Sequence, residues 1–406
     1  MNATLPHPNS DKFSKTLEIY QNAPLLAVRR LALTNFRCYN SLIINPRNKI
    51  VVLTGANGAG KTNLLEALSL LSPGRGLRQA QLPEMASEPT NYNFEGSTNL
   101  AYWAVGAEFS TQNGNLSVGV GWRKSSTDSR TIRINGTTIT SQAMLAQYIS
   151  MVWLIPAMDR LFIEAPAGRR QFLDRLVFAF DPEHASRLQA YDRTRKQRSR
   201  LLRESRANTS WLDALEQNTA AHAIAIAAAR VDLIEQLNIA IQDQREGFPQ
   251  PIVATQGLIE DWIKKLPALQ VEEKYAALLR KSRPNDRETG SCEGVHRSDL
   301  LAQLCKNGPF AEKASTGEQK AILISLILAH SRLLSGRNGQ TPLLLLDEIT
   351  AHLDSSRRDA LFEELIDIGA QTWLTGTDVG NFSTIRQRAE FYTISNGSIS
   401  EQNIHG

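Results

Sequence analysis

The sequence predicts an α/β fold in which a mixed sheet with helices carries a short, mostly helical insertion. A short apolar run at residues 50–53 precedes a glycine-rich loop, and apolar residues at helical spacing follow from 63 to 71. A second apolar run, residues 343–346, ends in two acidic residues. Between Gly168 and Gly247 the chain has no glycine and shows a helical pattern. Strands therefore mix with helices at both ends of the chain, and helices fill its middle.

The composition is that of an ordinary folded protein. The chain has 406 residues, of which 42% are apolar and 21% charged, so two or three domains with sizeable cores are expected. These values argue against wholesale disorder, a collagen-like fibre and a disulfide scaffold. The formal net charge is only +4, so any surface for nucleic acid must be a local patch.

Cysteine usage and hydropathy predict a cytoplasmic protein that does not enter the membrane. Cys38, Cys292 and Cys305 have no CxxC spacing, which favours reduced thiols over a zinc site or redox motif. The longest apolar runs, near residues 322–328 and 343–346, fall far short of the ~20 residues of a membrane span. The N-terminus lacks the apolar core of a secretory signal.

The N-terminal third is predicted to be rich in strands after a loose leader. Residues 1–24 are mostly polar, with prolines at positions 6 and 8, and predict no regular structure. Period-two and buried patterns then predict strands over residues 28–33, 50–53, 102–109, 116–123 and 131–134. Asn135-Gly136 is the dipeptide most typical of a tight hairpin turn.

The middle of the chain is predicted to be a helical arm. The helical pattern runs from about residue 167 to 245, and turn-forming residues at 284–294 close the segment. Two helices of ~40 residues would each span at most ~60 Å, so the arm is short. Eight basic and two acidic residues lie between positions 187 and 206. Such a run is usually a solvated helix face, with a contact to nucleic-acid phosphates as the alternative.

The last part of the chain returns to alternating helices and strands. Helices are predicted from Ser298, from about Thr316 and after Asp354, and strands over residues 343–346 and 372–375. The predicted domains are a leader at 1–24, a head made of 25–150 and 295–406, and an arm of 151–294.

Residues 55–62 fit the phosphate-binding pattern G-x-x-x-x-G-K-[ST] at every position. Its glycines let the backbone wrap closely around phosphates, and the N-terminus of the next helix adds positive potential. The lysine is a point charge for the β- and γ-phosphates, and the threonine hydroxyl is a ligand for Mg²⁺. The sequence thus predicts binding of ATP and Mg²⁺ by Gly55, Ala56, Asn57, Gly58, Ala59, Gly60, Lys61 and Thr62.

The acidic pair after residues 343–346 predicts the rest of the catalytic site. A buried strand would carry Asp347 to its tip, where the carboxylate can hold Mg²⁺. Glu348 would then lie where a carboxylate can orient or deprotonate the attacking water. Alone, the pattern fits a strand followed by a capping acid equally well. Together with the phosphate-binding loop it favours a catalytic role for Lys61, Asp347 and Glu348.

Residues 315–320, S-T-G-E-Q-K, begin an apolar helix and resemble the signature of ABC-type ATPases. Ser315 or Thr316 could also be a simple helix N-cap. In ABC-type ATPases this helix start grips the γ-phosphate held by a second copy. The resemblance implies a trans site and an ATP-dependent homodimer, formed by Ser315, Thr316, Gly317, Glu318 and Gln319. Asp354 matches the segment that crosses the dimer seam.

The order of these motifs resembles the RecF family of bacterial DNA replication and repair proteins, from about residue 25 to the C-terminus. Family-like segments occur at 33–39 (LTNFRCY), 72–78 (SPGRGLR), 165–174 (APAGRRQFLD), 294–299 (GVHRSD) and 375–378 (TGTD). Val295 stands where the family usually has proline. Thr377 and Asp378 stand where ABC transporters carry a switch histidine, which makes sensing of the γ-phosphate by histidine doubtful.

The resemblance implies a weak, DNA-stimulated ATPase that binds junctions between single- and double-stranded DNA at gaps. It implies that RecO and RecR are partners in loading recombinase, and that the chain takes part in the SOS response. It also implies that Arg37 and Asn63 belong to the nucleotide site. Arg75 and Arg78, next to the P-loop helix, are the predicted DNA contacts.

Two other classes of protein use a similar head. An ABC transporter subunit places its acidic strand much closer to the P-loop than the 285 positions that separate Thr62 from Asp347. An SMC-like DNA-tethering ATPase has coiled-coil arms of hundreds of residues, for which residues 167–245 are too short. A DNA-tethering role for the same head remains the alternative function.

Overall fold

The computed structural model describes residues 25–87, 102–124, 129–204, 208–244 and 248–402, so the predicted leader lies outside the described residues. Contacts divide the described chain into two compact units. The first unit contains residues 25–158, 248 and 327–402, and the second contains 159–244 and 249–326. Residues 151–158, which the sequence analysis assigned to the arm, lie in the first unit, and residues 295–326, which it assigned to the head, lie in the second. In both cases the reason is the pairing of strands described below.

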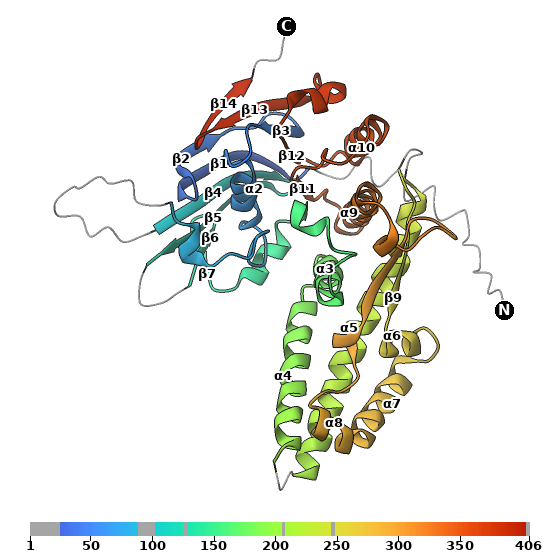
Figure 1. Ribbon diagram of the computed structural model, residues 1–406. Coiled ribbons are helices and arrows are strands. Elements are labelled where there is room, and N and C mark those ends of the chain that lie inside the picture. Colours follow the sequence, from blue (N-terminus) through green and yellow to red (C-terminus); the bar gives the residue numbers. More distant parts are fainter. Residues whose placement is uncertain (1–24, 88–101, 125–128, 205–207, 245–247, 403–406) are drawn as a thin grey trace. The chain divides into compact units, whose positions relative to one another are not determined.

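An antiparallel sheet forms one half of the first unit (Figure 1). Its six strands lie in the order β2-β1-β4-β5-β6-β7. Asn135 and Gly136 both have positive φ and connect β6 to β7, which confirms the predicted hairpin turn. The strands predicted over residues 28–33, 102–109, 116–123 and 131–134 are confirmed, whereas β2 and β7 were not predicted as strands. The bounds are β1 (Ala27–Phe36), β2 (Tyr39–Ile44), β4 (Tyr102–Thr111), β5 (Gly114–Arg123), β6 (Thr131–Ile134) and β7 (Thr137–Ile139).

A second sheet of six strands has the order β14-β13-β3-β12-β11-β8. The pairs from β13 to β8 are all parallel, and β14 is antiparallel to β13. β8, which the sequence did not predict, pairs with β11, and this pairing places residues 151–154 in the first unit. The bounds are β3 (Ile50–Thr54), β8 (Met151–Leu154), β11 (Leu343–Leu346), β12 (Thr372–Gly376), β13 (Ala389–Ser395) and β14 (Ser398–Gln402).

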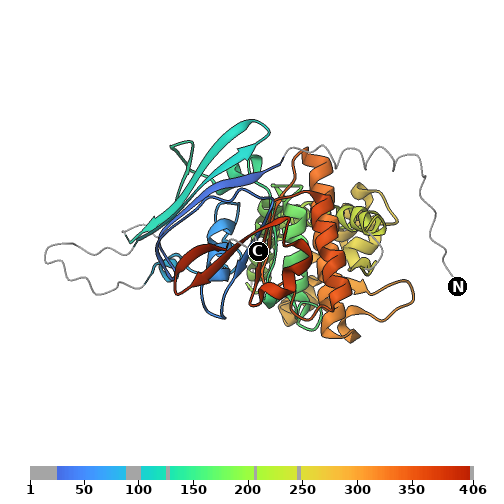
Figure 2. The same cartoon turned by 90° about the horizontal axis from the view of Figure 1, so that it is seen from above.

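Helix α2 (Lys61–Ser69) lies between the two sheets of the first unit (Figure 2). Its buried leucines share one apolar core with residues of both sheets, including Trp103 from the antiparallel sheet and Trp373 from the mixed one. α9 (Thr316–Asn338) and α10 (Ser355–Ile368) follow later in the chain, and the division between the units falls within α9. The core therefore fixes α2, and with it the loop that precedes this helix.

The second unit is built around helices α4, α5 and α7, which lie side by side (Figure 1). The predicted helix from Ser298 is wrong: residues 299–303 form β10, which pairs antiparallel with β9. Leu300 and Ala302 alternate with less buried residues, as in a strand. The bounds are α3 (Pro166–Phe178), α4 (His184–Leu202), α5 (Thr209–Gln242), β9 (Ile252–Gln256), α6 (Leu258–Ile263), α7 (Ala268–Lys281), α8 (Arg283–Thr289) and β10 (Asp299–Gln303).

The longer of the described helices carry apolar residues on the faces that pack inside the protein. The longest of them, α5, is half buried along its length by the other helices of its unit. None of the helices in the described part of the chain is long and apolar enough to cross a membrane.

A buried ionic cluster joins helices α3, α4, α5 and α6 of the second unit to the segment at Val295. Arg230, only 2% exposed, donates two hydrogen bonds of 2.8 Å to Asp174 and one of 2.8 Å to the carbonyl of Val295. Glu260 lies 3.4 Å from the same guanidinium, and His184 contacts Asp174 at 2.8 Å. Burial acts to raise the pKa of Asp174, but the hydrogen bonds from His184 and Arg230 outweigh it and lower that pKa. The carboxylate therefore stays charged and paired.

We predict that Arg230→Met strongly destabilises the second unit, because the buried Glu260 and the half-buried Asp174 would lose their cation. The expected loss is about 3–5 kcal/mol of unfolding free energy, measured by urea denaturation at neutral pH. Arg280→Met is the control, since Arg280 is 57% exposed and pairs with Asp213 on the surface. The control should leave the transition close to that of the wild type. Equal denaturation midpoints for the two variants would show that the cluster adds no more to the free energy of unfolding than a surface ion pair does.

Candidate nucleotide-binding site

The glycine-rich loop lies in the first unit between β3 and α2. Gly55, Gly58 and Gly60 all have positive φ, at 148°, 81° and 117°. A Cβ atom on Gly55 would lie 2.3 Å from the carbonyl oxygen of Ile394, and one on Gly60 would lie 2.7 Å from Cys38 Sγ. The backbone therefore runs too close to its neighbours for any other residue at these two positions. This close packing holds the loop in place before any ligand binds.

Lys61 reaches back under the loop that precedes it. Its ammonium group donates to the carbonyl oxygens of Gly55 at 2.8 Å and Ala56 at 2.9 Å, and the residue is only 4% exposed. These two contacts hold the positive charge at the centre of the loop. Phosphate oxygens are ionised acceptors and make stronger hydrogen bonds to a cation than neutral carbonyls do. The arrangement is thus a ready site for an anion.

The structure brings Thr62 and Asp347 together from positions 285 residues apart. Thr62 Oγ1 donates to Asp347, with distances of 2.8 Å to Oδ2 and 3.1 Å to Oδ1. Asp347 is 3% exposed and follows directly after β11. A hydroxyl and a carboxylate oxygen are the hard donors that Mg²⁺ prefers, usually completed by phosphate oxygens and water. The donor set therefore fits the predicted metal.

Thr375 is a functional residue that the sequence analysis missed. It is fully buried at the end of β12, and its hydroxyl donates to Asp347 Oδ1 at 2.7 Å. The same hydroxyl accepts the backbone N–H of Glu348 at 2.8 Å. Glu348 has φ of 47°, a left-handed conformation that is uncommon for a side-chain-bearing residue. One hydroxyl thus fixes both members of the acidic pair.

The signal for Thr375 was present in the sequence but needed the order of the sheet. β11 and β12 are parallel neighbours, with Leu346 opposite Leu374. Polar residues that follow each strand therefore meet at one edge of the sheet. A threonine at the end of a predicted apolar strand would point to this edge only once β12 was known to lie beside β11.

A buried glutamate on α2 organises the arginines next to the loop. Glu66 is 1% exposed, and Arg37 binds it with two hydrogen bonds of 2.6 and 2.9 Å. Arg78 donates to Glu66 at 3.2 Å and to the side chain of Asn63 at 2.7 Å. The predicted residues Arg37, Asn63 and Arg78 thus belong to one hydrogen-bond network around Glu66. Arg75, in contrast, is exposed in the loop that follows this helix.

The predicted trans signature belongs to the second unit, and the P-loop belongs to the first. Ser315 donates to Glu318 Oε2 through both its backbone N–H and its hydroxyl, each at 2.8 Å. The hydroxyl also accepts the N–H of Glu318 at 3.4 Å, as in a capping box. Ser315 and Thr316 are exposed and Gly317 is half-buried, while the side chain of Gln319 is buried and donates to a backbone carbonyl.

Asp354 also acts as a helix cap in this chain. Its carboxylate accepts the backbone N–H of Arg357 at 2.8 Å at the start of α10, and the side chain is 60% exposed. The geometry within one chain is therefore that of two capped helices, α9 and α10. A role for Ser315 or Asp354 at a dimer seam stays a prediction.

Comparison with known proteins points to one family. The family described as the RecF/RecN/SMC N-terminal domain matches residues 27–397. The chain is similar to the DNA replication and repair protein RecF of Rhizobium rhizogenes, with 42% identity over 92% of this chain and 98% of that relative. It is equally similar to the RecF of Mesorhizobium japonicum, with 42% identity over 92% of this chain and 97% of that one.

Solved structures share the fold at lower sequence identity. The recombination mediator protein RecF in the RecFOR pathway, solved with ATP, aligns with a TM-score of 0.78 and 22% identity. That alignment covers 94% of this chain and 98% of the solved one. The Smc head domain of Pyrococcus furiosus aligns with a TM-score of 0.51 and 14% identity, over 93% and 96% of the two chains. The predicted ABC-type ATPase fold is confirmed.

We predict that Thr375→Val lowers the rate of ATP hydrolysis about tenfold or more, with a much smaller change in KM. Valine keeps the shape of threonine but leaves Asp347 and the Glu348 N–H each one hydrogen bond short. A tenfold loss corresponds to ~1.4 kcal/mol of barrier, within the range for an unsatisfied buried group. Steady-state ATPase assays at several Mg²⁺ concentrations provide the measurement.

Thr375→Ser is the matched control, because it keeps the hydroxyl and should retain most of the rate. A merely structural role for Thr375 would lower thermal stability in both variants without separating their turnover. Equal rates for the valine and serine variants would contradict the positioning role.

Proposed function

We propose that this chain, which belongs to the RecF family of DNA replication and repair proteins, is an ATP-driven DNA-binding switch. In this proposal it binds ATP with Mg²⁺, dimerises, and binds junctions of single- and double-stranded DNA at replication gaps. It then helps to load recombinase with RecO and RecR. The contact between Thr62 and Asp347 is the observation that carries the proposal, since it joins the P-loop to the acidic strand.

The residues of the first unit suit the binding of a nucleotide. Thr62 and Asp347 would hold Mg²⁺, which neutralises charge on the phosphates when it is bound. Lys61 would exchange its two loop carbonyls for phosphate oxygens. Glu348, which follows Asp347 after β11, would act as a base and orient the attacking water. Slow hydrolysis at such a site suits a switch better than a metabolic enzyme.

The second unit would supply the trans half of the site. Ser315 and Thr316 are exposed at the start of α9, where a second copy of the chain can reach them. The γ-phosphate bound to that copy would replace Glu318 as the partner of the Ser315 hydroxyl. Together with Asp354, this explains how ATP could drive dimerisation.

The proposed DNA contact in the first unit centres on Arg75. Arg78, the other predicted contact, is bound to Glu66 and Asn63, so less of its charge is available to DNA. Arginine side chains commonly contact DNA phosphates, and such contacts carry no sequence information. The partners RecO and RecR and a cytoplasmic location are proposed from the family, whose solved member is named as part of the RecFOR pathway.

A DNA tether of the SMC type is the second candidate function. The fold similarity to the Smc head supports it, but α5, the longest described helix, has 34 residues and spans only about 51 Å. Binding assays separate the two functions. Preference for gapped over fully duplex DNA in the presence of ATP supports the repair function, whereas equal binding to both supports a tether.

We predict that Lys61→Met abolishes nucleotide binding or turnover, because the phosphates lose their point charge. Glu348→Gln should instead retain ATP and stop hydrolysis, since the amide cannot accept the proton from water. Binding of a fluorescent ATP analogue and steady-state ATPase rates measure the two effects. Wild-type turnover in the lysine variant would rule out this loop as the ATP site, and wild-type turnover in the glutamine variant would remove Glu348 as the base.

We predict that Ser315→Arg leaves ATP binding by the monomer intact but blocks ATP-driven dimerisation. The bulky cation would fill the space that the γ-phosphate of the second copy needs. Light scattering with and without ATP measures dimerisation, and Thr316→Ser is a mild control at the neighbouring exposed position. A Ser315→Arg protein that dimerises and hydrolyses ATP like the wild type would show that the signature does not act in trans.

A further inference from the structure

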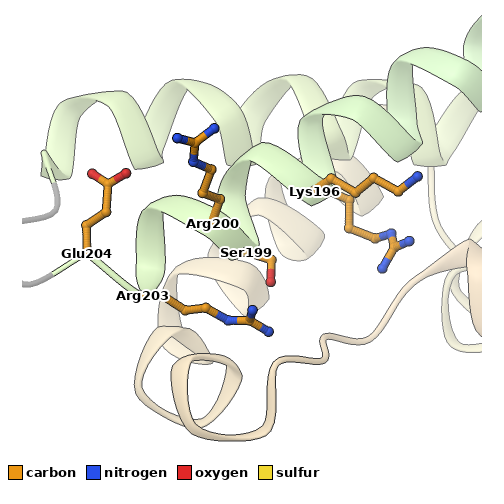
Figure 3. A pocket seen from close by; sticks show the side chains of 6 residues that line it. Lys196, Ser199, Arg200, Arg203 and Glu204 are labelled. Atoms are coloured by element: carbon orange, nitrogen blue, oxygen red, sulfur yellow. The ribbon is translucent and has the colours of Figure 1, made fainter.

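A line of positive charge follows helix α4 in the second unit. One pocket of about 410 Å³ is lined by Arg195, Lys196, Ser199, Arg200, Arg203 and Glu204, along the C-terminal part of the helix (Figure 3). A second pocket, of about 350 Å³, extends toward the start of the helix and shares Arg195 with the first. We call the two pockets together the α4 groove.

Three cations of the groove have no partner of opposite charge among the described residues. Lys196, Arg200 and Arg203 are exposed and form no ion pair there. Two other basic residues of the same helix are neutralised: Arg198 is buried against Glu216 and Asp286, and Arg187 pairs with acids of the preceding turn. Arg193 is also exposed and forms no ion pair with a described residue but lines neither pocket, so most, and not all, of the unpaired charge along α4 lies on the groove.

Arg195 links the two pockets and is only partly satisfied. It contacts Asp192 at 3.3 Å, but its Nε is buried and makes no hydrogen bond to any described residue. The other acids of the groove are Glu204, at its far end, and Asp174, which is already bound by Arg230. A buried guanidinium donor without an acceptor is costly. An anion in the groove would supply one.

The charge of the groove does not depend on histidine. His296 lines the second pocket and contacts the hydroxyl of Tyr191 at 2.7 Å. Burial, followed by the nearby Arg195 and Arg297, lowers the pKa of His296 to about 4. Its ring is therefore neutral at pH 7, and the positive potential comes from arginine and lysine alone.

The length and polarity of the groove indicate what it binds. Its lining runs from Leu188 to Arg203, about 22 Å of helix. A DNA strand carries one phosphate per ~3.4 Å of axis, so several phosphates fit this length. None of the large apolar side chains that are exposed in the described chain lies on α4. A protein partner would need such anchors, whereas nucleic-acid interfaces are polar and rich in positive charge.

We propose that the α4 groove binds the phosphate backbone of DNA without reading its sequence. The inference rests on the proposed DNA-binding function and adds a site in the second unit, separate from Arg75 in the first. The side chains of arginine and lysine, and the hydroxyl group of serine, are among those that commonly contact DNA phosphates. The sequence pattern alone left this helix as an ordinary solvated face; the pockets and the unpaired cations favour the contact.

The test uses the full-length protein and a labelled duplex oligonucleotide, followed by fluorescence anisotropy over a range of salt concentrations. The variant is Lys196→Gln, Arg200→Gln and Arg203→Gln together. Each lost phosphate contact should make the slope of log Kobs against log salt shallower by about 0.9 for duplex DNA, or ~0.7 for a single strand. Losing all three should change the duplex slope by about 2.7, equally for two unrelated sequences.

Two controls separate the groove from net charge and from misfolding. The first control is a triple variant that removes the same charge from exposed positions of the same unit that line neither pocket. Its substitutions are Lys265→Gln, Lys281→Gln and Lys306→Gln. Its slope should stay at the wild-type value. Arg200→Lys with Arg203→Lys keeps the charges and should also keep the slope. Thermal unfolding and ATP binding of the groove variant should match the wild type.

Several outcomes would overturn the inference. An unchanged slope in the groove variant removes the α4 groove as a DNA site. An equal change in the groove variant and the lysine control reduces the effect to net charge. Loss of a RecR or RecO contact with unchanged DNA binding would reassign the groove to a protein partner. If the wild type binds no DNA at all, the proposed function itself fails, which is a different result from the first three.

Discussion

The hydrogen bonds from Thr62 to Asp347 are the contact on which the nucleotide site depends. They join the first turn of α2 to the end of β11, and no local feature of either segment could create them. They exist because β12 lies between β3 and β11 in a parallel sheet. The carboxyl ends of the three strands then meet at one edge, where open α/β sheets generally bind their ligands. The order of the strands is thus the real determinant of the chemistry.

Much of this arrangement can be predicted from the sequence, and the remainder cannot, for physical reasons. Short apolar runs bounded by glycine or acidic residues predicted β3, β11 and β12 correctly, because buried parallel strands have a continuous apolar pattern. Thr375 was not predicted, since its role arises from register between strands and not from its neighbours in sequence. The P-loop residues are local, and a motif of eight positions is enough to find them.

In the second unit, as with β8 in the first, long-range pairing outweighs local pattern. Residues 299–303 looked helical, yet they form a strand because β9, more than forty positions earlier, offers them a partner. The ionic cluster of Arg230 was also beyond the sequence, since its acids come from α3 and α6 and its carbonyl partner from Val295. Charges of this kind are visible in a sequence only as ordinary polar residues of a helical arm.

Under the proposed function, Lys61 and Ser315 share a property that suits a reversible switch. Each has a partner within its own chain: loop carbonyls for the ammonium group and Glu318 for the hydroxyl. Binding of phosphate would therefore exchange one set of hydrogen bonds for another, and such an exchange has a small net free energy, about 0.5–1.5 kcal/mol for each bond. Neither group is left unsatisfied when the nucleotide leaves. The nucleotide-free chain is consequently not strained at these two positions, and the closed dimer can open again after hydrolysis without a large barrier from them.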